Sequence, residues 1–130
     1  MISVKNLQKS YTSEVHIGPL NLDIPRCGVT SLIGPNGAGK STMLLMIGRL
    51  LEMDSGSVSV AGLDVSEADS TSLAKQMAIL RQENHFVTKL TIRQLVGFGR
   101  YPYSKGNLTA EDEQIISKYI NFLGLKDLEH

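Results

Sequence analysis

The chain has 130 residues, 13 Lys and Arg against 13 Asp and Glu, and one cysteine. Its length suits a single hydrophobic core, and the balanced charge excludes an overall basic field of the kind that attracts nucleic acid or anionic lipid. One cysteine excludes an internal disulfide, and the apolar run at residues 43–47 is too short to cross a bilayer. We therefore expect a soluble, cytoplasmic protein without a nucleic-acid partner, connected to any membrane only through another protein.

The beginning of the chain predicts β-structure. Residues 2–7, ISVKNL, alternate apolar and polar side chains as a half-buried strand does. Residues 15–25, VHIGPLNLDIP, predict a second strand stretch that is interrupted at Gly18. The compact run GVTSLI, residues 28–33, predicts a buried strand that ends at Gly34. The opening section should therefore be antiparallel, followed by a strand that feeds a turn.

A central helix is predicted over residues 40–51, and its many apolar side chains should be covered around nearly the whole circumference. These positions are Met43, Leu44, Leu45, Met46, Ile47, Leu50 and Leu51. The sequence DSG at residues 54–56 should end this region. A strand over 57–62, a short helix within 70–77 and a strand over 77–80 are predicted to follow.

The last third of the chain predicts helices. Thr91 is a candidate N-cap with Gln94 at the capping-box position, and Thr109 and Asp112 repeat that pattern. Residues 101–107, YPYSKGN, predict a loop from their proline and glycine. The helix after Thr109 has one apolar face and a closing glycine: Ile115, Ile116, Tyr119, Ile120, Leu123 and Gly124. We expect two regions, residues 1–82 with mixed β and α structure and residues 83–130 with helices.

A glycine-rich loop carries the strongest functional signal. Gly34, Lys40 and Ser41 match the pattern G-x-x-x-x-G-K-[ST] between a predicted strand and a predicted helix. Glycines in such a loop let backbone N–H groups turn toward a phosphate, and the helix directs its positive end to the same point. Lys40 could reach the outer phosphates, the Ser41 hydroxyl could ligate Mg²⁺, and Thr42 could add a hydroxyl near the inner phosphate.

The loop therefore predicts binding of a nucleotide phosphate together with Mg²⁺. The phosphate-binding set consists of Gly34, Pro35, Asn36, Gly37, Ala38, Gly39, Lys40, Ser41 and Thr42. The loop alone does not choose between ATPases, GTPases and small-nucleotide kinases.

The wider sequence SLIGPNGAGKSTMLLMIGRLLEMDSGSVSVAGLDV resembles the nucleotide-binding domain of ABC-type ATPases. The resemblance implies an α/β fold of the P-loop NTPase class, with an N-terminal antiparallel β section and the start of a helical subdomain. It also implies that Tyr11 stacks on adenine and that Val15 packs near the ribose and base. Gln82 matches the family glutamine that reaches Mg²⁺ and the attacking water and couples the site to the transporter. With Lys40, Gln82 is then a candidate catalytic residue, and with Ser41 a candidate metal ligand.

The stretch LTIRQLVGFGRYPYSKGN is similar to ATPases of importers for ferric siderophores and, more loosely, for haem and vitamin B12. This resemblance implies the ATP-binding part of an importer ATPase for a ferric siderophore or similar iron complex. A second ATPase subunit would bind head to tail. Membrane permease subunits would bind through the Gln82 loop and the helical subdomain, and would hold the protein at the cytoplasmic face of the cell membrane.

Several elements of the family pattern are absent from the sequence. It contains no Leu-Ser-Gly-Gly-Gln signature, no apolar strand ending in Asp-Glu and no switch histidine after a signature. Asp64 follows an apolar run but is interpreted as a turn residue. We expect a truncated chain that ends shortly before the signature, and this stretch alone should bind ATP without hydrolysing it.

Two other functions remain open. The first is a nucleoside-monophosphate kinase, although such kinases usually begin with the P-loop strand, whereas a β-rich section precedes it here. The second is a nucleotide-binding module without catalytic activity.

Overall fold

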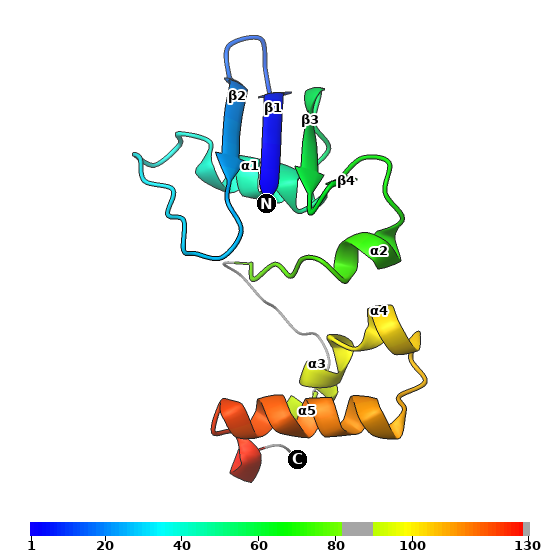
Figure 1. Cartoon of the computed structure of the whole chain (residues 1–130). Helices are drawn as coiled ribbons and strands as arrows, with labels where there is room; N and C mark the ends of the chain where they lie inside the picture. The colour runs from blue at the N-terminus through cyan, green and yellow to red at the C-terminus, as the bar shows by residue number, and fades with distance from the viewer. Residues whose placement is uncertain (82–89, 129–130) are drawn as a thin grey trace. The chain divides into compact units, whose positions relative to one another are not determined.

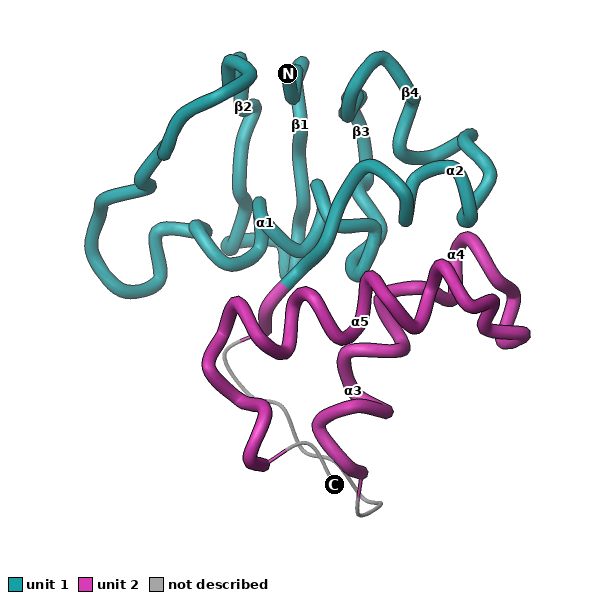
Figure 2. Tube along the Cα trace, turned by 60° about the horizontal axis from the view of Figure 1, so that its bottom comes forward, with its two compact units in different colours: residues 1–79 teal, residues 80–130 magenta. Residues whose placement is uncertain are grey.

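The computed structural model describes residues 1–81 and 90–128. The chain divides into two compact units, Met1–Ile79 and Leu80–His130 (Figure 2). The first contains the strands and the glycine-rich loop, and the second contains helices.

The first unit is built on a four-stranded antiparallel sheet with the order β2-β1-β3-β4 (Figure 1). The strands are β1 (Ile2–Ser10), β2 (His16–Ile24), β3 (Ser55–Val60) and β4 (Leu63–Asp64). Strand β1 pairs with β2 on one side and with β3 on the other, so it is an interior strand of the sheet. The predicted antiparallel opening is confirmed.

A close backbone contact interrupts the ladder around β1. Asn6 has a positive φ of 48°, and its N–H donates to the Asn21 side chain on β2 at 2.8 Å. Gly56, at the start of β3, lies directly against the Asn6 backbone, and a Cβ added there would collide with the carbonyl oxygen of Asn6. The pairing registers shift at this point on both sides of β1. Gly56 is therefore required by space as well as by its φ of 92°.

The end of β1 is tied to the segment before β3. The Asp54 carboxylate accepts hydrogen bonds from Lys9 Nζ at 2.6 Å and from the Ser10 N–H at 2.8 Å. The Asp54 N–H donates to the Gln8 carbonyl at 3.0 Å. The Lys9 ammonium and then the Ser10 N–H lower the pKa of Asp54 below its ordinary value of 3.8.

Helix α1 (Lys40–Ile47) lies across one face of the sheet (Figure 1). It buries one stripe of side chains in a core shared with the strands. That core consists of Val4, Leu7, Met43, Met46, Ile47, Val58, Val60, Val65 and Leu73. Leu44 is 52% exposed, so the prediction of a helix covered on nearly all sides is wrong. The helix also ends earlier than predicted, at the Gly48 C-cap.

Two predicted strands are not strands in the structure. Residues 28–33 have no regular structure, and Val29 and Ile33 are 97% and 94% exposed. Residues 77–80 are also irregular, with Leu80 90% exposed. A strand forms only where a neighbour completes its hydrogen bonds, and the described residues place no paired strand beside either segment. Composition alone therefore misassigned both.

The segment between β4 and residues 77–80 contains a turn and the short helix that the sequence predicts. Asp64 is the last residue of β4, so the prediction of a turn residue is wrong for its backbone. Its carboxylate accepts hydrogen bonds from the Ser66 and Glu67 N–H groups at 2.8 and 3.3 Å and thereby holds the turn that follows the strand. The predicted short helix is α2 (Ser70–Ala74), capped by the Asp69 side chain on the Ser72 N–H.

The second unit contains helices α3 (Ile92–Phe98), α4 (Tyr101–Ser104) and α5 (Ala110–Phe122) and the 3₁₀ helix η1 (Lys126–Leu128). Both predicted capping boxes are present, at the starts of α3 and α5. The prediction of a loop over 101–107 is wrong for its first half, because a proline is compatible with the first turn of a helix. Helix α4 stops where Lys105 and Gly106 take positive φ angles.

Helices α3 and α5 pack closely. Ile116 and Ile120 are buried, whereas Tyr119 and Leu123, predicted on the same face, are exposed. A Cβ at Gly97 would lie 3.6 Å from Ile116 Cδ1. The glycine that weakens α3 in isolation thus lies directly at the contact with α5.

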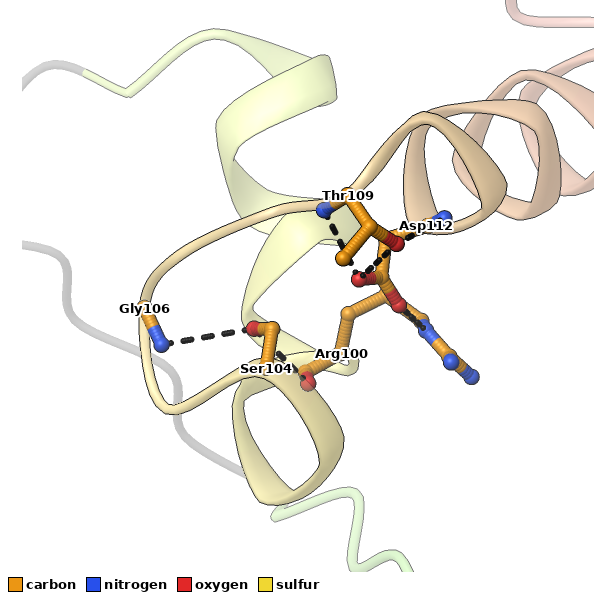
Figure 3. A network of polar contacts seen from close by, with 5 residues as sticks. All are labelled: Arg100, Ser104, Gly106, Thr109 and Asp112. Atoms are coloured by element: carbon orange, nitrogen blue, oxygen red, sulfur yellow. Dashed lines mark hydrogen bonds and ion pairs between the residues drawn. The ribbon is translucent and has the colours of Figure 1, made fainter.

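Asp112 is the only buried charged residue among those that the structure describes, with 4% of its surface exposed. Arg100 Nε donates to its Oδ1 at 2.7 Å, and the Thr109 N–H and hydroxyl donate to Oδ2 at 3.0 and 2.8 Å (Figure 3). The Arg100 guanidinium also lies 4.1 Å from the centre of the Tyr103 ring. The hydrogen bond from the Thr109 backbone and then that from Arg100 lower the pKa of Asp112 below 3.8.

Replacing Gly56 with alanine should lower the free energy of unfolding by more than about 2 kcal/mol, because the new methyl group meets backbone atoms that cannot rotate away. Gly62→Ala is the matched control. Its φ of 86° is also positive, but no atom lies within 4 Å of the added Cβ. Only the backbone cost of about 1–2 kcal/mol then applies. Urea denaturation followed by circular dichroism measures both, and equal losses would contradict the contact with Asn6.

The folded helical unit should lose stability as the pH falls below about 4. A carboxyl group whose pKa is lowered by folding contributes stability above its unfolded pKa, and that contribution is lost as it is protonated. Asp112→Asn should be less stable than the parent at pH 7 and should lose less of its free energy of unfolding between pH 5 and pH 2. Glu111→Gln removes an exposed acid from the same turn as a control. Thermal unfolding across this pH range tests the difference, which should vanish for the control.

Candidate phosphate-binding site

The glycine-rich loop forms a turn that leads directly into α1. Gly37 and Gly39 have φ angles of 81° and 85°, and the Ala38 N–H donates to the Pro35 carbonyl at 3.3 Å. A Cβ added at Gly37 would meet nothing within 4 Å, so open space surrounds that residue. Residues 34–38 are exposed. The segment is neither a continued strand nor a buried helix, and an anion has access to it.

The first turn of α1 has no side-chain cap. Its N-cap residue is Gly39, which has no side chain to accept a hydrogen bond, and no acidic residue lies in the first turn. The N–H groups of Lys40, Ser41 and Thr42 precede the first intrahelical donor, the Met43 N–H, which binds the Gly39 carbonyl at 2.9 Å. This end of the helix therefore presents backbone donors and the positive end of the helix dipole to the loop.

The Lys40 side chain folds back over the loop. Its Nζ donates to the carbonyl oxygens of Gly34 at 2.8 Å and Pro35 at 2.6 Å. An ammonium group has three protons, so two of them hold the turn and the third remains for another acceptor. The arrangement places a positive charge beside the uncapped helix end.

Gly39 also fixes the loop against the sheet. A Cβ at this position would lie 2.9–3.1 Å from three side-chain atoms of Ile17 on β2. The backbone of the loop therefore approaches β2 more closely than any residue with a side chain would allow. The sequence motif indicates Gly39 only as part of the phosphate loop, and nothing in it predicts this contact with Ile17.

The structure brings Tyr11 next to the predicted phosphate-binding residues. Its hydroxyl lies 3.1 Å from Thr42 Oγ1 on α1. The Tyr11 N–H donates to the Val15 carbonyl at 3.0 Å, so Val15 belongs to the same turn. Tyr11 and Val15 are about half exposed, and Ser41 is exposed. Gln82, the remaining predicted site residue, lies outside the described residues.

Polar residues of the β1–β2 turn were not predicted to contribute to the site. Thr12 Oγ1 accepts hydrogen bonds from the Val15 N–H at 3.1 Å and the Glu14 N–H at 3.3 Å. His16 contacts Ser10 Oγ through Nδ1 at 3.0 Å and the Ser13 carbonyl through Nε2 at 2.8 Å. The Ser and Thr content of YTSEVH was the available signal, because such side chains often bind nearby backbone groups in turns.

In the part of the chain that the structure describes, no group of three or more His, Cys, Asp and Glu side chains could hold a metal ion. No helix there has the length and apolar character needed to cross a membrane.

A sequence model of the ABC transporter family matches residues 17–130, which include the whole glycine-rich loop and α1. The chain belongs to the ABC transporter family. This ABC transporter chain is 68% identical over 130 residues to the petrobactin import ATP-binding protein FatE of Bacillus anthracis, covering all of the chain and 52% of that protein. It is 35% identical over 128 residues to the iron(3+)-hydroxamate import ATP-binding protein FhuC of Bacillus subtilis (strain 168), covering 97% of the chain and 48% of that protein.

Solved structures agree with this family. An ATP-binding subunit of an ABC transporter is similar with a TM-score of 0.80 and 25% identity, over 98% of this chain and 52% of that one. The ATP-binding cassette MJ0796, solved as a dimer with ADP and Pi, shares the fold with a TM-score of 0.77 and 24% identity, over 100% and 61% of the two chains. The ABC transporter chain thus spans about half the length of the curated relatives it matches.

Proposed function

We propose that this chain is the ATP-binding part of an ABC importer ATPase, and that the glycine-rich loop binds the triphosphate of ATP together with Mg²⁺. The observation that carries the proposal is the uncapped start of α1 with Lys40 folded over the turn that precedes it. Backbone donors, a helix dipole and one ammonium group together favour a multiply charged anion.

The proposed roles follow from the position of each side chain. Lys40 keeps its two carbonyl partners and donates its third ammonium proton to the outer phosphates, and the exposed Ser41 hydroxyl is a ligand for Mg²⁺. Thr42, one residue further into α1, lies at the inner phosphate. Gln82 is proposed as the residue that contacts Mg²⁺ and the attacking water, on the family resemblance alone.

Tyr11 and Val15 are proposed to hold the adenine and ribose. The support is their common turn and the contact of Tyr11 with α1, which place a half-exposed aromatic ring beside the phosphate loop. Aromatic rings offer a stacking surface to a base.

Transport of an iron complex is proposed from the relatives, whose names include petrobactin, iron(3+)-hydroxamate and hemin import. We expect a ferric siderophore as the transported solute, and petrobactin first, because the relative at 68% identity carries that name. One proposed partner is a second ATPase subunit, as in the MJ0796 dimer. The other, proposed from the ABC transporter family, is a permease that holds the protein at the cytoplasmic face of the membrane.

Hydrolysis is proposed for the whole subunit and not for residues 1–130 alone. Phosphoryl transfer needs a positioned water, a base and charge stabilisation around the leaving phosphate. Lys40 and Ser41 supply charge and a metal ligand, but the sequence contains no Leu-Ser-Gly-Gly-Gln signature and no Asp-Glu pair after an apolar strand. This stretch should therefore bind ATP·Mg²⁺ with little turnover.

Lys40→Ala should weaken ATP·Mg²⁺ binding at least about tenfold, because charge-assisted hydrogen bonds to the phosphates are lost. Isothermal titration calorimetry of the chain measures the affinity. Lys118→Ala removes an exposed lysine from α5 as a control and should leave the affinity unchanged. Equal affinity of Lys40→Ala and the parent would refute phosphate binding by this loop.

A strain whose full-length protein carries Lys40→Ala should lose energy-dependent uptake of a ferric siderophore. Uptake of radioactive iron supplied as ferric petrobactin, ferric hydroxamate or haem measures the transport and separates the three solutes. The Lys118→Ala strain is again the control. Normal petrobactin uptake with impaired haem uptake would contradict the assignment to a siderophore importer.

A further inference from the structure

The Tyr11 and Thr42 hydroxyl groups form a direct link between the β1–β2 turn and the first turn of α1. Their oxygens lie 3.1 Å apart although the residues are 31 positions apart in the sequence. The Tyr11 ring needs no hydroxyl to act as a stacking surface. The contact with Thr42 therefore gives the Tyr11 hydroxyl a partner that stacking of the ring does not require.

The turn that carries Tyr11 is held in shape by hydrogen bonds of Tyr11 itself and of residues before and after it in the sequence. The Tyr11 N–H binds the Val15 carbonyl, and Thr12 Oγ1 accepts the Val15 N–H. The preceding residue, Ser10, is fixed through its N–H to the Asp54 carboxylate. Tyr11 thus extends from a constrained backbone, and its hydroxyl has a defined partner.

Thr42 can bind Tyr11 and a phosphate at the same time. A hydroxyl group has one donor proton and two acceptor lone pairs. When Thr42 Oγ1 donates its proton to a phosphate oxygen, its lone pairs accept the proton of the Tyr11 hydroxyl. Hydrogen bonds in such a chain polarise one another, so the negative charge of the phosphate strengthens the Tyr11–Thr42 bond as well.

We propose that Tyr11 and Thr42 form a two-step hydrogen-bond chain to the phosphates, in which Tyr11 is a positioning residue that orients the Thr42 hydroxyl. This inference rests on the proposed binding of ATP at the loop. It gives the Tyr11 hydroxyl a role at the phosphates that is separate from any contact of its ring with the base.

The test uses a ligand without a base. Tyr11→Phe keeps the ring and removes the hydroxyl, and inorganic tripolyphosphate with Mg²⁺ contains only the phosphate part of ATP. Tyr11→Phe should weaken both ATP·Mg²⁺ and tripolyphosphate·Mg²⁺ by a similar factor of about three to ten, the size of one lost hydrogen bond. Isothermal titration calorimetry of the full chain measures both affinities, and thermal unfolding of Tyr11→Phe should match the parent.

A double-mutant cycle shows whether the effect passes through Thr42. In a Thr42→Val background, Tyr11→Phe should cause no further loss of tripolyphosphate affinity. In a Thr42→Ser background, which keeps the hydroxyl, the loss should return. Tyr119→Phe is the matched control, because that tyrosine is 52% exposed against 53% for Tyr11 and lies on α5 in the other unit. It should leave both affinities unchanged.

Three results would overturn the proposed Tyr11–Thr42 hydrogen-bond chain. These are tripolyphosphate affinity of Tyr11→Phe equal to that of the parent, a loss of affinity from Tyr11→Phe that is as large in the Thr42→Val background as in the parent, or a loss in Tyr119→Phe as large as that in Tyr11→Phe. These differ from failure of the proposed function. If the parent protein binds neither ATP nor tripolyphosphate more tightly than Lys40→Ala does, the proposed phosphate site is wrong. The Tyr11–Thr42 hydrogen-bond chain is then wrong as well.

Discussion

Packing of α1 against the antiparallel sheet is the interaction on which the candidate site depends. Met43, Met46 and Ile47 are buried together with Val4 and Val58 in one core. Because these side chains fix the helix to β1 and β3, they also fix the direction in which its uncapped first turn points. The glycine-rich loop is held from its other side by the contact of Gly39 with Ile17. The exposed loop therefore gains its geometry from a buried layer beneath it.

The sequence predicted well those elements whose determinants are local. The capping boxes at Thr91 and Thr109 depend on residues three positions apart, and both formed as expected. The runs at 28–33 and 77–80 have the composition of buried strands but lie exposed, because a strand depends on a partner that its own residues do not specify. The Arg100–Asp112 ion pair was missed for a similar reason, since neither residue identifies the other in sequence.

The same distinction applies to the candidate site. The spacing of Gly34, Lys40 and Ser41 was sufficient to locate the loop and its position at the start of a helix. The contacts that shape the loop could not be predicted, because they join distant parts of the chain. Ile17 against Gly39 and Tyr11 against Thr42 arise only when β2 and the β1–β2 turn fold beside α1.

The Asp54 carboxylate has a consequence for how the chain can vary in length. It joins the segment that leaves α1 to the last two residues of β1, one position before Tyr11. An insertion between α1 and β3 would separate Asp54 from Lys9 and Ser10. The position of the Tyr11 side chain relative to α1 would then change. An insertion in the exposed segment before the glycine-rich loop would leave the connection intact. Length variation among natural relatives should therefore concentrate before the loop and avoid the stretch that follows the helix.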